Sequence, residues 1–483
     1  MLKPDEIIAL IDADRTSTKK LNAELGEKYY EGEHDIKQHR LFYFNSDGVL
    51  VEDKTRSNIR IAHPFFTENV DQCVQYMMSG DENFIQSDIP ELQEMLDEYF
   101  DEEFYSELAD TLTDTCVAGF GYMYAYKSAD DRVKFCTADE MGVVEVKARD
   151  ASDHKDHIIH WYIDRIEKGS RVIKRIEDWD DEQTYYYIQE GSKALELDVD
   201  VEINPRPHIL YKKDGDESIY YDAFGFVPFF RLDANKKQIS HLKPIKDIID
   251  DYDVMNCALS NNLADFDNPI YLVKGFKGDN LDELQTNLKT KRTVGIGDNG
   301  GLEVHTVEIP YQARKEKMDI DKQNIYKFGM GFDSSQVGDG NITNIVILSR
   351  YALLELKCNK LEKKVKAFLK KLAKVVIEEI NKANDTDYSI KDIDIKINRE
   401  TMTNALDNAT IEKTKAETIQ IAVTTILNAA SMLDADTVTE ALCEQLDLDF
   451  DEVKDKLPDE PQTDINQAST SLAETTIAGD VVE

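Results

Sequence analysis

The charge balance of this 483-residue chain argues against several classes of protein. It carries 96 acidic and 57 basic residues, a formal net charge of -39, and self-repulsion on that scale disfavours tight adhesion to a nucleic-acid backbone. A surface past which DNA slides, halophilic adaptation and plain solubility all remain open as explanations. The length predicts more than one region, and a hydrophobic share of 41% is enough for genuine cores.

The cysteines and the apolar runs set further bounds. No CxxC pair occurs and no histidine stands at zinc-ligand spacing, so we expect buried, reduced cysteines and no metal site. No run reaches the roughly 20 apolar residues that span a bilayer, and no secretory leader pattern opens the chain, so we expect a cytosolic protein without a membrane span. The cysteines are Cys73, Cys116, Cys136, Cys257, Cys358 and Cys443.

The first half of the chain alternates between helical and extended patterns. Helical spacing over residues 4–30 is followed by a hairpin pattern over residues 41–53. A long helical region is expected from residue 64 to about 117. It lies within a stretch, residues 61–126, that contains no Lys or Arg, which predicts a strongly negative face. A β-rich region is expected from there to about residue 231.

The second half predicts long helices separated by a small folded unit. That unit should contain a strand, a short helix and two strands either side of residues 297–301, and a glycine-containing polar stretch precedes the longest helix. The expected elements are a helix over 244–266, the small unit over 270–309, a helix over 311–328, a polar stretch over 329–343, a helix over 344–382, a strand over 393–397 and helices over 408–456.

Motifs for phosphate and dinucleotide binding do not provide a function. No Walker loop is present, which excludes an ATPase of the P-loop class. The run from Gly295 to Gly300 matches G-x-G-x-x-G, but the alternation after it predicts a strand where dinucleotide binding needs a helix N-terminus. We therefore interpret this run as a hairpin turn.

Histidines and carboxylates offer two weak candidates for chemistry. His154, His157 and His160 could bind a metal ion, but their surroundings predict a strand, so we favour solvated or hydrogen-bonded histidines. The acidic stretch 81–114 could hold divalent cations or act as general acid and base. Such charge runs are usually solvated faces.

A lysine-rich segment of the longest predicted helix opposes the overall charge. The favoured interpretation is an amphipathic helix whose apolar stripe packs while its lysines remain solvated or meet the acidic face of a neighbour, and contact with DNA phosphates is the alternative. The stripe is Leu353, Leu356, Leu361, Val365, Phe368, Leu369 and Leu372. The lysines are Lys357, Lys360, Lys363, Lys364, Lys366, Lys370, Lys371 and Lys374.

Several segments, taken in order, resemble the portal proteins of long-tailed bacteriophages. The passage from Ala118 to Tyr122 is similar to that family's Gly-x-Gly-Tyr step, and the passage from Gly225 to Pro228 to its Gly-x-x-Pro entry to the stem. Residues 245–266 resemble the first stem helix, residues 269–275 the opening strand of the clip, and residues 325–333 the end of the second stem helix.

The chain departs from the family pattern in two places. Residues 343–346 replace a Ser-Gly-x-Ala step, which leaves the entry to the tunnel helix in doubt, and a proline is missing around residues 137–141. The resemblance implies an α+β, mostly α-helical portal fold that assembles as a ring. The implied regions are a wing over 1–243 and 383–407, stem helices over 244–268 and 310–333, a clip over 269–309, a tunnel loop over 334–343, a tunnel helix over 344–382, a crown over 408–457 and a disordered acidic tail over 458–483.

The function implied is that of a non-enzymatic portal protein without a cofactor. Such a ring, usually of twelve subunits, forms the channel for packaging and ejecting double-stranded DNA at one vertex of the virion capsid. The implied partners, met in the host cytoplasm during assembly, are further copies of the chain, double-stranded DNA, the terminase large subunit, major capsid and scaffolding proteins, and a head-completion or adaptor protein. No membrane is involved. Another virion protein, such as a minor head or capsid component, and a metal-dependent nuclease using Asp97 and Glu98 are the alternatives.

The resemblance also assigns site residues. Those lining the DNA channel in the tunnel loop would be Ser334, Ser335, Gln336, Val337, Asp339, Asn341 and Thr343. Those contacting DNA or a neighbouring subunit would be Lys357, Lys360 and Lys364. Those docking the terminase or adaptor on the clip would be Lys277, Asp279, Asn280, Lys289, Lys291 and Arg292.

Overall fold

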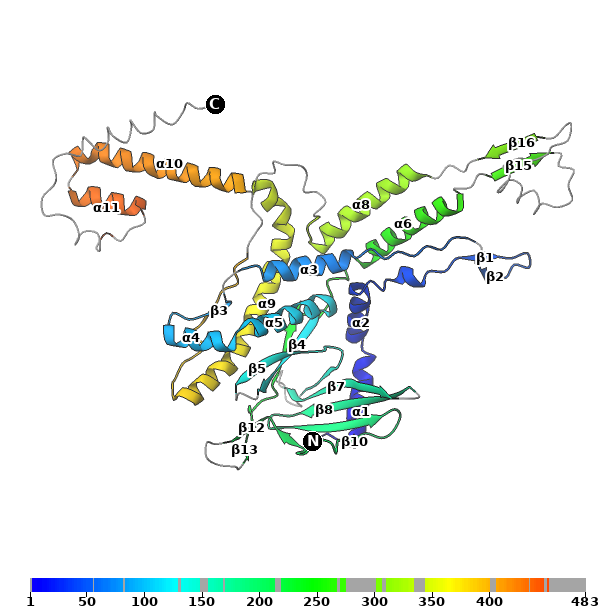
Figure 1. The fold of residues 1–483 in the computed structure, drawn as a ribbon, viewed down its shortest axis with the longest axis horizontal. Helices are drawn as coiled ribbons and strands as arrows, with labels where there is room; N and C mark the ends of the chain where they lie inside the picture. The colour runs from blue at the N-terminus through cyan, green and yellow to red at the C-terminus, as the bar shows by residue number, and fades with distance from the viewer. Residues whose placement is uncertain are drawn as a thin grey trace. The chain divides into compact units, whose positions relative to one another are not determined.

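The protein mixes helices and strands and divides by its contacts into two units (Figure 1). Unit 1 comprises Met1–Asp339 and Leu348–Thr401, and unit 2 comprises Gly340–Ile347 and Met402–Glu483. The computed structural model describes residues 2–54, 56–80, 83–128, 132–147, 155–167, 170–212, 219–266, 270–274, 301–305, 310–333, 344–399, 405–433, 435–446 and 450.

The N-terminal helical segment is two helices rather than the single one that periodicity predicted. Helix α1 (Pro4–Arg15) ends where Ser17 begins α2 (Thr18–Tyr30), because the Ser17 hydroxyl accepts a hydrogen bond from the backbone of Lys20 at 3.3 Å. A short 3₁₀ helix, η1 (Asp35–Gln38), follows. The predicted hairpin is confirmed as the antiparallel pair β1 (Phe42–Phe44) and β2 (Leu50–Glu52).

The helical region expected from residue 64 to about 117 consists of separate helices with one short strand between them. It consists of α3 (Phe65–Met77), a short strand β3 (Ile85–Gln86), α4 (Pro90–Tyr99) and α5 (Glu102–Ala118). Proline begins α4, where its missing N–H costs nothing. The Asp101 carboxylate caps α5 by accepting from the backbone of Phe104 at 2.9 Å. Local capping therefore overrides the continuous apolar pattern.

The predicted β-rich region forms an antiparallel meander and a smaller sheet. In the meander the order is β10-β9-β8-β7-β6, with β11 on the edge of β9, and in the smaller sheet it is β14-β4-β5. A separate antiparallel pair, β12 and β13, lies in the chain after the meander and before β14. The strands are β4 (Phe120–Lys127), β5 (Val133–Ala138), β6 (Val143–Lys147), β7 (Lys155–Glu167), β8 (Arg171–Trp179), β9 (Gln183–Glu190), β10 (Glu196–Leu197), β11 (Arg206–Pro207), β12 (Ile209–Lys212), β13 (Ile219–Asp222) and β14 (Phe229–Asp233).

Two glycines explain the helix-to-strand passage that carried the family resemblance. Gly119 ends α5 in the left-handed conformation, with φ at 96°, and a Cβ there would lie 2.6 Å from the carbonyl oxygen of Gln238. Gly121 brings β4 against α5, where a Cβ would meet the carbonyl oxygen of Thr111 at 2.7 Å. Both positions therefore need glycine for close backbone packing.

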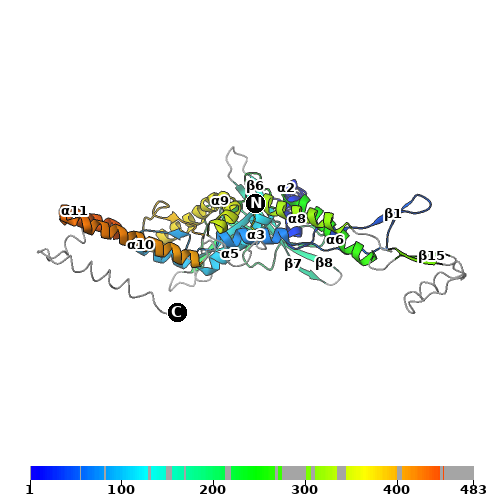
Figure 2. The same cartoon turned by 90° about the horizontal axis from the view of Figure 1, so that it is seen from above.

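The described residues in the second half of unit 1 follow the predicted order of helix, strands, helix and long helix, and the short helix predicted within the small unit lies outside them. Helices α6 (Lys246–Phe266) and α8 (Tyr311–Gly329) pack side by side in both views (Figures 1 and 2). Between them in the chain, β15 (Ile270–Lys274) pairs antiparallel with β16 (Gly301–His305). A strand thus follows the glycine-rich run, as expected, and the helix that dinucleotide binding requires is absent there. The long helix is α9 (Asn344–Asn384).

The main core of unit 1 joins α3, α5 and α9 to the smaller sheet (Figure 1). Its α9 stripe comprises Leu361, Val365, Phe368, Leu369 and Leu372, all at most 2% exposed. The predicted late strand is β17 (Asp394–Ile395), which pairs with β3 and so returns the chain to the first half. Unit 2 contains α10 (Ala405–Ala429), a 3₁₀ turn η3 (Ala430–Met432) and α11 (Ala435–Leu446).

Candidate functional site

The candidate site is the base of the α6/α8 pair, which is the end formed by the start of α6 and the last turn of α8. The predicted tunnel loop follows this end of α8 in the chain. Helix α8 ends at Gly329, and Met330 takes the left-handed conformation. Phe332 then exchanges two hydrogen bonds with the Gln72 side chain of α3, at 2.7 and 2.9 Å. The Tyr326 hydroxyl donates to Glu68 on the same helix at 2.6 Å. These contacts fix the start of the loop to α3.

Lys357 lies inside the protein, whereas the sequence pattern grouped it with the solvated lysines of this helix. It is 7% exposed, and its ammonium donates to the Asn69 side-chain oxygen at 2.5 Å and to the Gly329 carbonyl at 3.2 Å. The cation therefore joins α9, α3 and the last turn of α8. Its charge is used within the subunit, so the predicted contact of Lys357 with DNA or a neighbouring subunit does not fit its buried position.

The remaining lysines form a basic stripe along the exposed face of α9. Lys360 and Lys364 are exposed and form no ion pair within the part of the chain that the structure describes. Lys366 pairs with Glu362 at 2.9 Å and Lys374 with Glu378 at 3.5 Å. The stripe consists of Lys360, Lys363, Lys364, Lys370, Lys371 and Lys374. Leu353 and Leu356, which the sequence placed in the packed stripe, are instead 39% and 49% exposed.

The predicted loop and clip sites lie outside the described residues. For the tunnel loop these are Ser334, Ser335, Gln336, Val337, Asp339, Asn341 and Thr343. For the clip these are Lys277, Asp279, Asn280, Lys289, Lys291 and Arg292. The predicted acidic tail is also outside them.

The weak metal and nuclease candidates have local partners. His157 and His160 lie on β7, where His157 contacts Asp178 at 2.8 Å and His160 contacts Glu177 at 3.5 Å, whereas His154 lies outside the described residues. In the acidic stretch, Asp97 accepts from Asn83 and Gln93, and Glu98 pairs with Arg132 at 2.9 Å. Neither set converges on a shared point.

A partly buried carboxyl cluster lies where α2 and α5 meet the turn between β5 and β6, with Glu140 buried, Glu27 half-buried and Asp139 exposed. Glu27, Asp139 and Glu140 bring carboxylate oxygens within 4.8 Å of one another. Burial, followed by the charges of neighbouring acids, raises the pKa of Glu27 to about 7 and that of Glu140 to about 9. The same causes raise the pKa of Asp114 to about 7. The folded state therefore favours the protonated carboxyls.

We predict that raising the pH through about 7 and then about 9 destabilises the protein at this cluster. Carboxyls with a raised folded pKa contribute stability below their unfolded pKa, near 4.5, and lose it as the pH passes the folded value. Glu140→Gln should therefore raise the free energy of unfolding at alkaline pH by roughly 2 kcal/mol. Denaturant titrations across this pH range measure it, and exposed Glu94→Gln is the control. Identical pH profiles for both variants would contradict the assignment.

The sequence did not predict a segment, residues 57–63, that runs extended along α6 and is called the strap here. Its alternate backbone N–H groups donate to side chains spaced four residues apart on the helix. Two extended residues advance about 6–7 Å and four helical residues about 6 Å, so the two repeats match. The bonds are Ser57 to Asp265 at 3.0 Å, Ile59 to Asn261 at 2.6 Å, Ile61 to the Cys257 sulfur at 3.2 Å and His63 to Asp253 at 3.1 Å.

The strap leads back to the β1/β2 hairpin, whose apolar side chains are exposed. Phe44 is 71% exposed, Leu50 55% and Phe42 51%. Exposed apolar patches of this kind are typical of interaction surfaces. The hairpin and the strap together make an arm anchored on α6.

Comparisons with known proteins give the chain its relatives. The family model described as "Phage portal protein, SPP1 Gp6-like" matches residues 11–456. The portal protein of Bacillus phage SPP1 is 27% identical over 71% of this chain and 67% of its own. The portal protein of Clostridium phage phiCD119 is 24% identical over 78% of this chain and 85% of its own. A chain from a solved structure of the neck of an empty GTA particle aligns with a TM-score of 0.40 and 13% identity, over 80% of this chain and 91% of that one.

Within the residues that the structure describes, every helix is too short or too polar to cross a bilayer.

Proposed function

Because the chain belongs to the SPP1 Gp6-like family of phage portal proteins, we propose that it forms a ring at one capsid vertex, through which double-stranded DNA is packaged and ejected. The family match over residues 11–456 carries this proposal. The order of α6, the β15/β16 pair, α8 and α9 supports it, because it is the order of stem, clip, stem and tunnel helix implied by the resemblance. The role is structural and requires no bond-breaking by this chain.

The regions are assigned on this basis. Helices α6 and α8 form the stem, the segment holding β15 and β16 forms the clip, and residues 334–343 form the tunnel loop facing DNA. The clip docks the terminase large subunit during packaging and a head-completion or adaptor protein afterwards. Major capsid and scaffolding proteins surround the wing. Assembly takes place in the host cytoplasm.

Two surfaces of the subunit suit contact with a second copy. The apolar β1/β2 hairpin extends from the body on its strap, so burying it on a neighbour would remove exposed Phe and Leu side chains from water. The exposed lysine stripe of α9 is complementary to the acidic residues that dominate the chain, whose net charge is -39. Head-to-tail contacts between unlike surfaces close into a ring.

The proposal is tested on the purified full chain by native mass measurement and negative-stain electron microscopy. We expect closed rings with a central channel, of about twelve subunits as the family resemblance implies. A chain that remains monomeric at high concentration and with its capsid proteins would overturn the proposal. So would magnesium-dependent cleavage of plasmid DNA by clean protein that is lost on substituting Asp97 and Glu98.

We predict that Phe44→Asp in the hairpin weakens ring assembly. Burying one Phe side chain contributes roughly 1.5–3 kcal/mol, so the concentration for half-assembly should rise at least about tenfold. Sedimentation velocity measures this shift. Val199→Asp, at a 91% exposed aliphatic residue outside the hairpin, is the control. Equal assembly by the two variants, each with an unchanged circular dichroism spectrum, would show that the hairpin does not contact a neighbour.

A further inference from the structure

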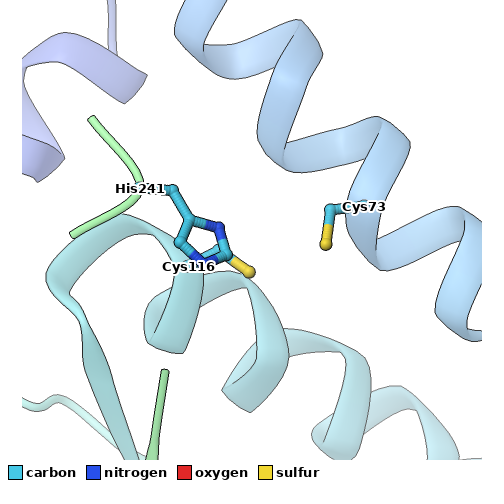
Figure 3. A group of neighbouring side chains, drawn as sticks. All are labelled: Cys73, Cys116 and His241. Atoms are coloured by element: carbon cyan, nitrogen blue, oxygen red, sulfur yellow. The ribbon is translucent and has the colours of Figure 1, made fainter. Parts of the chain in front are cut away.

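Three side chains from distant parts of the sequence converge inside unit 1. Cys73 lies on α3, Cys116 on α5, and His241 in the segment between β14 and α6 (Figure 3). The two sulfurs and one imidazole nitrogen all lie within 4.8 Å of one another. Both cysteines are completely buried. Sulfur and nitrogen donors in this combination are the ligands that zinc prefers.

His241 has a buried ring nitrogen without a hydrogen-bond partner, and a metal ion would provide one. Its Nδ1 is buried and has no hydrogen-bond partner among the described residues. Buried polar atoms are rarely left unsatisfied, because each costs about 1–3 kcal/mol. His241 is also held in place by its own backbone N–H, which donates to the carbonyl of Cys116 at 3.0 Å. The His241 imidazole is therefore fixed beside the Cys116 thiol.

Cys358 on α9 lies next to this cluster but outside it. Its sulfur, also fully buried, is 3.8 Å from the sulfur of Cys73, whereas a disulfide would need a separation of about 2.05 Å. The donor atoms that all lie within 4.8 Å of one another belong to Cys73, Cys116 and His241, so these three residues are the candidate ligands.

An ion bound by two thiolates and one imidazole carries no net charge, so the buried site needs no further counterion.

We propose that Cys73, Cys116 and His241 bind one thiophilic divalent cation of the zinc class. Binding releases the thiol protons to solvent and replaces S–H bonds with metal–sulfur bonds. The ion would link α3, α5 and the lead-in to α6. It would thereby fasten the base of the α6 and α8 pair, and the proposal stands whether or not the chain forms a ring.

The test uses the full chain, purified under reducing conditions with zinc and then dialysed against a weak chelator. Elemental analysis should find about one zinc per chain. Replacing zinc by cobalt should give the visible and thiolate charge-transfer bands of a tetrahedral sulfur-rich site. Cys116→Ser and His241→Ala should lose the ion or alter the cobalt spectrum, whereas Cys136→Ser, a cysteine outside the cluster, should retain both.

The outcome on the unmodified protein is decisive even if a variant fails to fold. A folded chain that retains neither zinc nor cobalt would overturn the proposal, and so would thiol titration that reveals a Cys73–Cys358 disulfide. A metal that binds but persists unchanged in folded Cys116→Ser and His241→Ala would place the site elsewhere and equally overturn it.

Discussion

Replacing Lys357 by alanine is expected to lower the free energy of unfolding by about 3 kcal/mol. The ammonium is the shared donor for the Asn69 side chain and the Gly329 carbonyl, and it is almost fully buried. Without it, both oxygens remain buried and unsatisfied, and the lysine stem leaves a cavity. Gly329 is also the last residue of α8, where a cation favourably meets the helix dipole. Chemical denaturation of the purified chain measures the change.

The matched control is Lys360→Ala, three residues further along the same helix on its exposed face. Surface substitutions of this kind usually change stability by less than about 0.5 kcal/mol. Hydrogen exchange at the end of α8 provides a second measurement, because Lys357→Ala should release protection there while Lys360→Ala should not. Equal stability losses in the two variants would mean that Lys357 is no more than one of the solvated lysines.

The order and type of the helices followed from the sequence because they depend on local periodicity. The apolar stripe from Leu361 to Leu372 repeats at helical spacing, and it is buried as expected. The same periodicity could not show that α3, α4 and α5 are separate, since the breaks depend on capping at Pro90 and Asp101. It also could not show that Leu353 and Leu356 face outward.

The features that define the base of the helix pair depend on contacts between distant residues. Lys357 looks like its neighbours in a lysine-rich run, and only the position of Asn69, 288 residues away, shows that it is buried. The strap has no periodic signal because its partners are the side chains of α6. The cysteine and histidine cluster has no spacing rule, since each of its ligands comes from a different element. A helix-face pattern in α6, with Asp253, Asn261 and Asp265, was the signal available for the strap.

Replacing Asp253 by alanine is expected to release the strap and lower the free energy of unfolding by about 3–4 kcal/mol. The carboxylate is fully buried and 2.7 Å from the Nδ1 atoms of both His34 and His63. It also accepts from the backbone of His63 at 3.1 Å. Removing it leaves the buried His34 imidazole, the partly exposed His63 imidazole and one N–H without this acceptor. Thermal and chemical unfolding of the variant measure this loss.

The same carboxylate predicts how stability depends on acid. Burial alone would raise the pKa of Asp253, but hydrogen bonds from His34 and His63 outweigh it and hold this pKa below its ordinary value. A group with a depressed folded pKa contributes stability above its unfolded pKa, near 3.8, and loses it as the pH falls through the folded value. The wild-type protein should therefore lose this contribution in strong acid, and the variant has none to lose.

Two further substitutions on α6 provide a graded comparison for Asp253→Ala. Asp247→Ala changes an exposed carboxylate and should leave stability within about 0.5 kcal/mol. Asp265→Ala removes the acceptor of the Ser57 backbone N–H at the strap's other end, at an exposed carboxylate, and should cost about 1 kcal/mol. If the strap positions the hairpin for a neighbouring subunit, Asp253→Ala should also reduce ring assembly more than Asp265→Ala at equal folded concentration. Assembly that follows stability alone, with no excess loss for Asp253→Ala, would restrict the strap to a role in folding.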